Sequence, residues 1–371
     1  AGTSKLRRPL RSDDTESCLG LCRALGAQID TSDPGCWVIE GTGGVPQAPD
    51  EVVDVGNSGT TLFLGMSAAA LSPGLIRMTG DEQIRSRSAA PLIRALGQLG
   101  ATARSLRDNG CAPLEVGEGL KGGSVSIECP TSQYMSSLLI GCPGASGDSE
   151  IDAPLLHEKP YVEMTRRWLL TAGVELEASE DLQHFSVPGG QTYQAFEETV
   201  PADFSSATFF LVAAAITGSR LLLKGLDMDD SQGDKAVVGM LEEMGCETAV
   251  RGDGIEISGP DRLEGATFDL NATPDAIPAM AVVGALADGE TRLVNVPQAR
   301  MKETDRLEVM SEELGKMGVR VRELPDGLVI QSGKLEGDSV RGHSDHRVVM
   351  ALAVAGLAAV GRTVVATAEA A

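Results

Sequence analysis

Five helix-like segments along the chain end in the same way, with a small-residue stop followed by a strand-like run. The stops are ALGA at 24–27, QLGA at 98–101, TAGV at 171–174, EMGC at 243–246 and KMGV at 316–319, with glycines Gly26, Gly100, Gly173, Gly245 and Gly318. These glycines are 74, 73, 72 and 73 residues apart. Each stands where a helix C-terminus favours a left-handed residue, so the pattern predicts a structural unit repeated about every 73 residues.

A second series lies between these stops, where a polar turn of small residues precedes an apolar helix. Its markers are Ser58, Ser132, Ser205, Asp275 and Asp345, at steps of 74, 73, 70 and 70 residues. The helices that follow are apolar nearly all round, as at 209–218 and 276–289, which is typical of enclosed helices. We expect equivalent helix N-termini to face a shared surface, where their partial positive charge favours anions.

The repeat also predicts how the chain is divided. We expect an N-terminal lobe at 1–200 with three units, the first incomplete, and a C-terminal lobe at 201–371 with two full units and the start of a third. A sixth glycine stop is due beyond Ala371, and the first unit lacks material before Ser12. We therefore expect the chain to be truncated at both ends. Each unit combines strands with buried helices, which predicts mixed sheets.

Charge and composition exclude several classes of partner. Asp and Glu outnumber Lys and Arg by 53 to 31, for a formal charge of −22, and this field repels nucleic acid and anionic membranes. The longest apolar run, 348–361, has 14 residues, too few to cross a bilayer. The seven cysteines form no CxxC pair, which argues against a disulfide framework or a zinc site and fits a reducing cytoplasm. His343 and His346 have HxxH spacing but no evident third ligand, so we expect no metal.

Nine strings in order along nearly the whole chain resemble the 5-enolpyruvylshikimate-3-phosphate synthases. They are SDDT at 12–15, GNSGTT at 56–61, RSRSAAPLIRALGQLGA at 85–101, TSQYMSSLL at 131–139, KPYVEMT at 159–165, DFSSATFFLVAAAI at 203–216, PDAIPAMAV at 274–282, RMKETDRL at 300–307 and SDHRVVMALAVA at 344–355. The resemblance implies an α/β fold of two lobes, each an inside-out α/β barrel built from repeated βαβαββ units, which closes on substrate at a hinge.

The resemblance also implies the chemistry. An enolpyruvyl group passes from phosphoenolpyruvate to the 5-hydroxyl of shikimate 3-phosphate, on the route to chorismate and the aromatic amino acids, and phosphate is released. The reaction needs cations for two phosphates and two carboxylates, a base for the hydroxyl and an acid for the methylene carbon. It requires no metal and no cofactor. We expect a cytoplasmic monomer that binds these two small molecules, with no nucleic-acid or membrane partner.

By resemblance, one set of residues binds phosphoenolpyruvate: Asn57, Gly59, Arg87, Gln133, Arg306 and Arg347. Arg306 and Arg347 would hold its carboxylate and Arg87 its phosphate. A cation in the first turn of a helix, as at Arg347, opposes the helix dipole unless an anion lies between them. The alternative for Arg347 is a surface salt bridge to Asp345. For Arg306, the alternative is a solvated helix face that it shares with Lys302 and Asp305.

The resemblance assigns catalysis to Asp275, which handles the proton of the 5-hydroxyl, and Glu303, which passes a proton to the methylene carbon. Asp275 could instead be a helix N-cap and Glu303 an ordinary helix-surface acid. The predicted shikimate 3-phosphate site consists of Thr131, Ser132, Gln133, Tyr161, Asp275, Gln298 and Lys302. For Ser132 the alternative is a capping role.

The sequence departs from the family pattern at several positions. No counterpart of the family's N-terminal Lys-Ser pair and following Arg precedes SDDT, and a C-terminal Lys would fall beyond Ala371. Phe63 stands where the family usually has Arg, and Glu158 stands where a Ser contacts the shikimate phosphate. Two alternatives to the synthase therefore remain open. One is an enolpyruvyl transferase for another acceptor, such as a UDP-sugar, and the other is a catalytically silent homologue.

Overall fold

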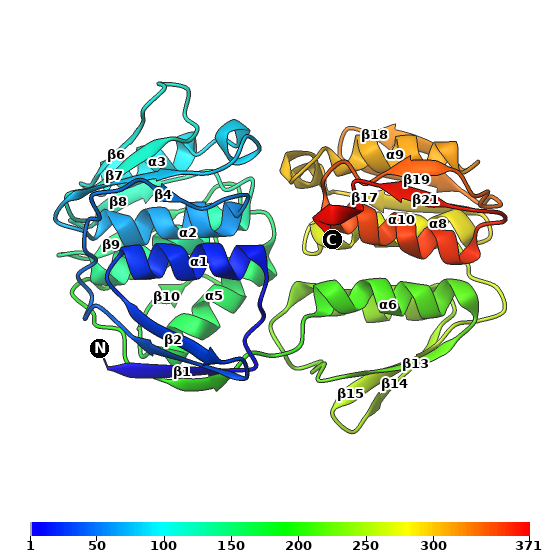
Figure 1. Ribbon diagram of the computed structural model, residues 1–371, viewed down its shortest axis with the longest axis horizontal. Coiled ribbons are helices and arrows are strands. Elements are labelled where there is room, and N and C mark those ends of the chain that lie inside the picture. The colour runs from blue at the N-terminus through cyan, green and yellow to red at the C-terminus, as the bar shows by residue number, and fades with distance from the viewer. Residues whose placement is uncertain (1) are drawn as a thin grey trace. The chain divides into compact units, whose positions relative to one another are not determined.

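The computed structural model describes residues 2–371, and the chain forms two compact units, Ala1–Val200 and Pro201–Ala371 (Figure 1). Unit 1 contains helices α1 (Asp13–Ala24), α2 (Gly59–Ala70), α3 (Ala90–Gln98), α4 (Ser132–Gly141) and α5 (Lys159–Thr171), with short 3-10 turns η1 (Ile84–Ser86) and η2 (Cys142–Gly144). Its strands are β1 (Thr3–Arg7), β2 (Gln28–Asp33), β3 (Cys36–Glu40), β4 (Val53–Asp54), β5 (Leu75–Thr79), β6 (Thr102–Ser105), β7 (Leu114–Gly117), β8 (Gly123–Ser126), β9 (Ser149–Asp152), β10 (Glu177–Ala178), β11 (His184–Val187) and β12 (Glu197–Thr199).

Unit 2 contains helices α6 (Phe204–Thr217), α7 (Ala236–Glu243), α8 (Ile277–Leu286), α9 (Arg306–Lys316) and α10 (His346–Ala358), with 3-10 turns η3 (Gly233–Lys235), η4 (Pro274–Ala276), η5 (Pro297–Met301) and η6 (Ala368–Ala370). Its strands are β13 (Arg220–Lys224), β14 (Glu247–Arg251), β15 (Gly254–Ser258), β16 (Thr267–Asp269), β17 (Glu290–Val294), β18 (Arg320–Leu324), β19 (Gly327–Gln331), β20 (Ser339–Arg341) and β21 (Val364–Ala366).

The sheets repeat one topology. Three of them have the orders β4-β5-β7-β6, β8-β9-β11-β10 and β16-β17-β19-β18. In each, the first two strands are parallel and the remaining neighbours are antiparallel. A parallel pair needs a crossover, and the helix that follows the first strand supplies it. These mixed sheets, each with strand, helix, strand, helix and two strands in chain order, agree with the predicted βαβαββ unit.

The first sheet, of order β12-β1-β3-β2, is assembled differently. Its parallel partner for β1 comes from the far end of unit 1, where Glu197 to Thr199 pair with Lys5 to Arg7. The predicted lobe boundary, between residues 200 and 201, lies just after β12, and no strand was predicted there. Because β1 and β12 lie almost 200 residues apart, the residues around each strand do not indicate that the two strands pair.

The glycine stops have the predicted conformation. Gly26, Gly100, Gly173, Gly245 and Gly318 have φ values of 101°, 90°, 74°, 105° and 89°. Each stands two residues after the last residue of α1, α3, α5, α7 or α9. In this left-handed region a side chain would be strained, so glycine ends the helix and turns the chain into the next strand.

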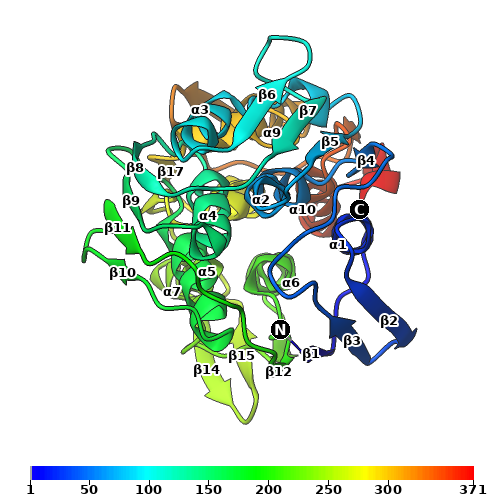
Figure 2. The ribbon, with the colours of Figure 1, turned by 90° about the vertical axis from the view of Figure 1, so that its left-hand side faces the viewer.

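The apolar helices lie inside each unit, as predicted. In unit 2, α6, α8 and α10 pack against one another, with strands on the outside (Figure 1). Every residue of α8 from Ile277 to Ala285 is buried. In unit 1, α2 packs beside α4, and α4 beside α5 (Figure 2). No helix formed by residues 2–371 is long and apolar enough to span a membrane.

Candidate functional site

Three helix starts meet on one surface of unit 2. Asp203 caps α6 by accepting from the backbone of Ser205 and Ser206, and Asp345 caps α10 by accepting from the backbone N–H of Arg347 at 2.9 Å. Nη1 of Arg347 donates to Oγ of Ser205 at 2.6 Å. Nη2 of Arg347 lies 3.3 Å from Oδ2 of Asp275, just before α8. The starts of α6, α8 and α10 therefore face the same way, as the spacing of the polar turns predicted.

A buried guanidinium lies at the centre of this surface. The side chain of Arg306 is 1% exposed and donates to three carboxylates. Its Nε contacts Oδ2 of Asp345 at 2.8 Å, its Nη1 contacts Oδ1 of Asp275 at 2.7 Å, and its Nη2 contacts Oε2 of Glu303 at 2.6 Å. Burial alone would lower the pKa of Arg306, but the three carboxylates outweigh it and raise that pKa above its ordinary value. Arg306 is therefore a permanent cation that fixes three acids in place.

The carboxylate of Asp275 is surrounded by cations. Besides Arg306 and Arg347, Nζ of Lys302 lies 3.8 Å from its Oδ1. Burial would raise the pKa of Asp275, but Arg347, Lys302 and Arg306 together lower it well below the ordinary value. Asp275 is therefore ionised. It is only a weak base as long as no other anion binds these cations.

The charges of this cluster balance. Lys302, Arg306 and Arg347 supply three positive charges, and Asp275, Glu303 and Asp345 supply three negative ones. Lys302, Glu303 and Asp275 are partly exposed, whereas Arg306 and Asp345 are buried. The exposed side of the cluster can thus exchange ion pairs with a ligand, while the buried side keeps the geometry fixed.

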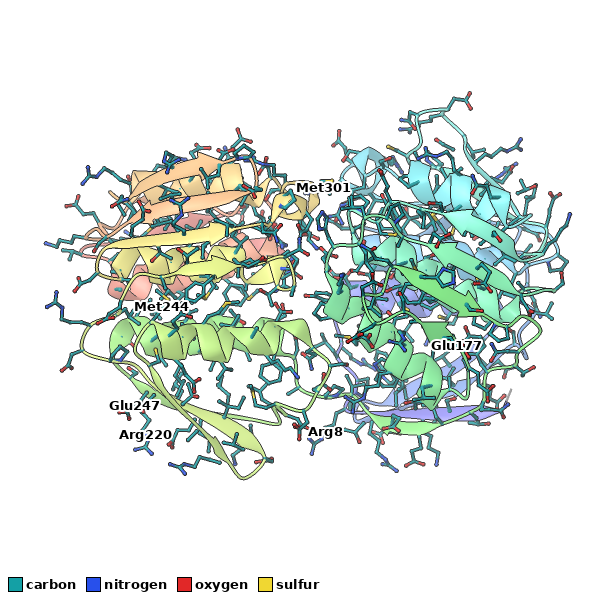
Figure 3. The ribbon with its side chains drawn as sticks, turned by 180° about the vertical axis from the view of Figure 1, so that it is seen from behind. Arg8, Glu177, Arg220, Met244, Glu247 and Met301 are labelled. Carbon is teal, nitrogen blue, oxygen red and sulfur yellow. The ribbon has the colours of Figure 1, made fainter. Side chains whose placement is uncertain are left out.

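The structure contradicts the non-functional interpretations of Asp275, Glu303 and Arg306, which were an N-cap, a helix-surface acid and a solvated helix face. Asp275 is not an N-cap, because it lies in η4 and α8 is preceded by Ala276 with no side-chain cap. Helix α9 begins only at Arg306, so Lys302 and Glu303 lie before it and share no helix face with Arg306, which is buried rather than solvated. Met301, the last residue of η5, is exposed at this turn (Figure 3).

The alternative for Arg347 is wrong for a related reason. Asp345 is fully buried, and its side chain binds Arg306, 39 residues away, together with the backbone of its own helix. The guanidinium of Arg347 turns instead to Ser205 and Asp275. Ser205 and Asp345 marked helix starts in the sequence, but their roles as partners of the two arginines were not predicted.

In unit 1, the residues predicted to bind phosphoenolpyruvate lie around the starts of α2 and α4. A Cβ atom on Gly59 would lie 2.5 Å from Nη1 of Arg87, so the guanidinium passes directly over this glycine. Nε2 of Gln133 donates to Oγ1 of Thr60 at 2.9 Å and thereby joins the first turns of the two helices. Nδ2 of Asn57 donates to Gln83 at 2.8 Å. Their contacts with a ligand remain predictions.

The predicted shikimate 3-phosphate residues of unit 1 surround the start of α4. Thr131 is its N-cap and Ser132 its first residue. Ser132 is therefore not the N-cap of α4. Thr131 has that role, because its hydroxyl oxygen accepts from the backbone N–H of Gln133. Tyr161 lies half-buried in the first turn of α5, and its N–H donates to the carbonyl of Glu158 at 3.0 Å. Phe63 is buried and packs edge-on against Tyr134, with ring centroids 5.3 Å apart, so an apolar contact stands where the family pattern has a cation.

Gln298, which is predicted to bind shikimate 3-phosphate, is buried. Its side chain is 1% exposed, and its Nε2 donates to the carbonyl of Asn271 at 2.9 Å. Its Oε1 is buried without a hydrogen-bond partner among residues 2–371. In this conformation Gln298 does not reach the surface, and contact with an acceptor would require it to move.

A separate cluster supports the loop before α10. Oε1 of the buried Glu313 accepts from Nε2 of His343 at 2.7 Å and from Nζ of Lys316 at 2.9 Å, and its Oε2 accepts from the backbone of Arg341 at 3.0 Å. Glu312, Glu313 and His343 offer three ligand atoms within 4.8 Å of one another. The ammonium of Lys316 already lies 2.9 Å from a carboxylate oxygen of each glutamate. His346, the other member of the HxxH pair, lies outside it.

Glu313→Gln is expected to lower the free energy of unfolding by about 1.5–3 kcal/mol at pH 7, since charged hydrogen bonds are lost from a buried group. Burial would raise the pKa of Glu313, but the contacts with His343, Lys316 and Arg341 lower it overall. A lowered pKa stabilises the fold above the ordinary value of 4.5, and this contribution is lost as pH falls through the folded-state value. In urea unfolding, the difference in the free energy of unfolding between wild type and Glu313→Gln should therefore become smaller below about pH 4.5.

The matched control is Glu312→Gln, which removes the exposed partner of Lys316 and should change stability by less than about 1 kcal/mol. If the stability difference between wild type and Glu313→Gln stays the same from pH 7 to below about pH 4.5, the ionic role of the Glu313 carboxylate is contradicted.

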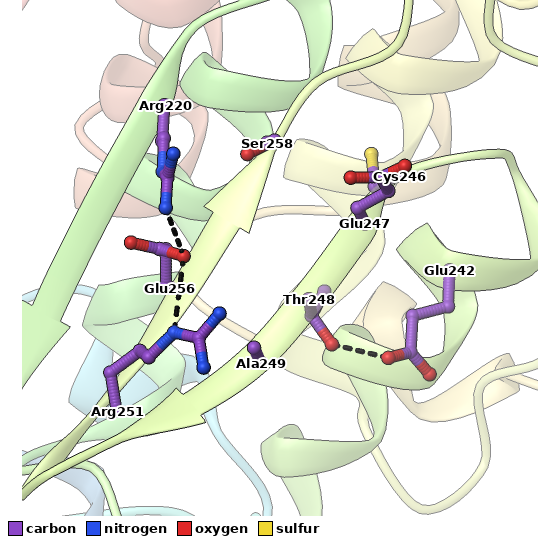
Figure 4. Close-up of a pocket in the computed structure, with 9 residues that line it drawn as sticks. All are labelled: Arg220, Glu242, Cys246, Glu247, Thr248, Ala249, Arg251, Glu256 and Ser258. Atoms are coloured by element: carbon purple, nitrogen blue, oxygen red, sulfur yellow. Dashed lines mark hydrogen bonds and ion pairs between the residues drawn. The ribbon is translucent and has the colours of Figure 1, made fainter.

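A hollow of about 550 Å³ lies on the three-stranded sheet of unit 2 (Figure 4). Its lining residues are Arg220, Glu242, Cys246, Glu247, Thr248, Ala249, Arg251, Glu256 and Ser258, and they include no residue predicted to bind substrate. Arg220 and Arg251 both pair with Glu256, at 2.7 and 3.4 Å. Because three glutamates face two arginines, this hollow does not favour an anion.

Comparisons with known proteins agree over the whole chain. The family model described as EPSP synthase (3-phosphoshikimate 1-carboxyvinyltransferase) matches residues 1–371. A 3-phosphoshikimate 1-carboxyvinyltransferase of Acetivibrio thermocellus is 52% identical over 369 residues, covering 100% of this chain and 86% of that protein. One from Ruminiclostridium cellulolyticum is 49% identical, covering 100% and 87%. The solved EPSP synthase of Acinetobacter baumannii superposes with a TM-score of 0.81 at 27% identity, covering 99% of this chain and 86% of that one.

Proposed function

The chain belongs to the EPSP synthase family, and we propose that it transfers the enolpyruvyl group of phosphoenolpyruvate to the 5-hydroxyl of shikimate 3-phosphate, in aromatic amino acid biosynthesis. The observation that supports this most directly is the buried ionic cluster, in which one carboxylate, Asp275, contacts three cations. The reaction needs such a cluster, because its substrates carry several negative charges and its hydroxyl must lose a proton. We also propose that the chain works without a cofactor, as a cytoplasmic monomer.

The cations have two different tasks in this proposal. Arg347 and Lys302 are partly exposed and can exchange Asp275 for a substrate anion. The carboxylate of phosphoenolpyruvate binds the partly exposed Arg347, and it reaches the buried Arg306 only when a carboxylate partner of Arg306 shifts. Arg87 binds the phosphate of phosphoenolpyruvate, and Lys302 binds the shikimate side. Arg306 also keeps Asp275 and Glu303 in position, because it holds both through separate nitrogens.

Substrate binding activates the base in this scheme. When substrate anions bind Arg347 and Lys302, these cations stabilise the ionised form of Asp275 less, so its pKa rises and it becomes a better proton acceptor. Asp275 then takes the 5-hydroxyl proton as that oxygen attacks the C2 carbon of phosphoenolpyruvate, and Glu303 passes a proton to the methylene carbon. The resulting tetrahedral ketal loses a proton from the methyl group and expels phosphate, which restores the double bond.

The acceptor is held by neutral donors at the start of α4 and by Lys302. Thr131, Ser132 and Gln133 offer hydroxyl, amide and backbone donors in the first turn of a helix, where the dipole also favours an anion. Tyr161 provides a further hydroxyl from the neighbouring helix α5. This arrangement suits a phosphate attached to a polar ring.

A coupled phosphate-release assay tests the proposed function. The chain is expected to release phosphate from phosphoenolpyruvate only when shikimate 3-phosphate is present, and the product should carry the enolpyruvyl group on the 5-oxygen. Release with a UDP-sugar but not with shikimate 3-phosphate would assign the activity to another acceptor. Binding of neither substrate would support a catalytically silent homologue. Size-exclusion chromatography tests the monomer.

Gly59→Ala is expected to raise the KM for phosphoenolpyruvate by on the order of tenfold while the melting temperature hardly changes. The new methyl group would overlap the guanidinium of Arg87, whose flexible end can move away at little cost to the fold. A displaced Arg87 then meets the donor phosphate in the wrong place. Gly97→Ala is the matched control, since a Cβ there has no neighbour within 4 Å. An unchanged KM for Gly59→Ala would argue against a role for Arg87 in donor binding.

A further inference from the structure

A carboxylate already occupies the start of helix α4. Oε2 of Glu158 accepts from the backbone N–H of Ser132 at 3.0 Å, from the Ser132 hydroxyl at 2.7 Å and from the Thr131 hydroxyl at 3.4 Å. Glu158 is 2% exposed although it is charged. A buried charge of this kind needs compensation, and these donors together with the helix dipole provide it.

The backbone of Glu158 has an unusual conformation. The residue precedes α5 with a φ of 57°, in the left-handed region that few residues other than glycine adopt. It occupies the N-cap position of α5, yet its side chain makes no capping hydrogen bond to that helix. The carboxylate is directed to the neighbouring helix instead, and α4 and α5 pack side by side (Figure 2).

The donors that hold Glu158 are those assigned above to the phosphate of the acceptor. The Ser132 N–H and its hydroxyl each carry one hydrogen, so neither can donate fully to a phosphate oxygen while it donates to Glu158. A carboxylate and a phosphate at this distance also repel each other. The two anions therefore compete for one position.

We propose that Glu158 is an internal anion that occupies the phosphate position at the start of α4 and sets the specificity of this enzyme for its acceptor. This proposal rests on the proposed function. The phosphate of shikimate 3-phosphate binds only when the Glu158 carboxylate leaves these donors, so part of the binding energy of the phosphate is used to displace it. As a result, wild type distinguishes phosphorylated from unphosphorylated shikimate less strongly than a chain without this carboxylate.

Two substitutions distinguish the effect of the negative charge of Glu158 from the effect of its hydrogen bonds to Thr131 and Ser132. Glu158→Gln keeps the length and an acceptor oxygen but removes the repulsion. Glu158→Ser removes the charge and vacates the donors. Calorimetric titration with shikimate 3-phosphate should give affinities that rise from wild type to Gln to Ser, with a total gain on the order of tenfold or more. The affinity for unphosphorylated shikimate should stay within about twofold, because that ligand carries no phosphate to compete.

The matched control is Glu163→Gln, which removes a half-exposed carboxylate from α5, the helix that Glu158 precedes. It pairs with Arg166 and should leave both affinities unchanged. Adding Ser132→Ala to Glu158→Ser should remove most of the gain, because the vacated hydroxyl is then absent. Melting curves show whether each variant is folded, and the Gln and Ser variants serve as independent tests.

The outcomes separate this proposal from the proposed function. If wild type turns over both substrates but neither Glu158 variant binds shikimate 3-phosphate more tightly, the proposal is wrong and the function stands. An equal gain for shikimate and shikimate 3-phosphate would also overturn it, because the effect would not involve the phosphate. If neither wild type nor the variants bind shikimate 3-phosphate, the proposed function fails together with this inference.

Discussion

Arg306→Ala is expected to abolish transfer activity and to lower the free energy of unfolding by about 3–5 kcal/mol. The substitution leaves Asp275, Glu303 and Asp345 without their shared cation, and Asp345 is fully buried. The loss should appear in urea unfolding followed by circular dichroism and in the phosphate-release assay. Arg220→Ala, which removes an exposed arginine from the same unit, should cost less than about 1 kcal/mol.

Arg306→Lys separates the two effects. A lysine restores the charge but not the planar fork that reaches three carboxylates through different nitrogens. We therefore expect this variant to recover part of the stability and little of the activity. Full activity in Arg306→Lys would show that the geometry of the guanidinium is unimportant, and normal stability in Arg306→Ala would contradict the ionic cluster itself.

Asp275→Asn is expected to lower kcat by about 10²–10⁴-fold, the range typical of a lost general base, while the variant stays folded. The amide has nearly the same shape as the carboxylate, so the surrounding packing is kept. Asp288→Asn, at a half-exposed carboxylate of the same unit, is the control and should leave kcat unchanged. Unchanged kcat in Asp275→Asn would remove Asp275 from the chemistry.

The pH dependence of wild type provides a second readout on Asp275. In the free enzyme its pKa lies below the ordinary 3.8, so kcat/KM should show no acidic limb from this group above about pH 4. In the substrate complex, the anions neutralise its cations and its pKa rises, so the acidic limb of kcat should lie at higher pH than that of kcat/KM. Identical limbs in the two profiles would contradict activation by substrate.

Local chemistry made the helix ends and the buried helices predictable. A left-handed glycine after a helix depends on a few neighbouring residues, so Gly26 and its four counterparts marked the helix ends from sequence alone. A helix that is apolar all round, such as α8, has to be enclosed whatever covers it. The polar turns predicted that Asp275 and Arg347 lie at the starts of neighbouring helices. In the structure, Nη2 of Arg347 lies 3.3 Å from Oδ2 of Asp275.

The choice of partner within the site could not be predicted in the same way. Asp345 had a charged neighbour two residues away, yet its side chain binds Arg306, because packing brings the start of α9 against the start of α10. Glu158 was recognised as unusual by resemblance, but nothing in the sequence shows that it reaches Ser132, 26 residues earlier. Ion pairs of this kind depend on tertiary distances, which residue spacing does not contain.

The pairing of β1 with β12 has a consequence for biosynthesis. Strand β1 lies at the beginning of unit 1 and its parallel partner at the end, with Lys5 opposite Glu197. A ribosome must therefore translate almost the whole of unit 1 before this edge can close, and closing such a long loop slows folding. In nascent chains stalled before Glu197, β1 can pair only with β3, so the protection of β1 from protease should increase once Thr199 has left the exit tunnel.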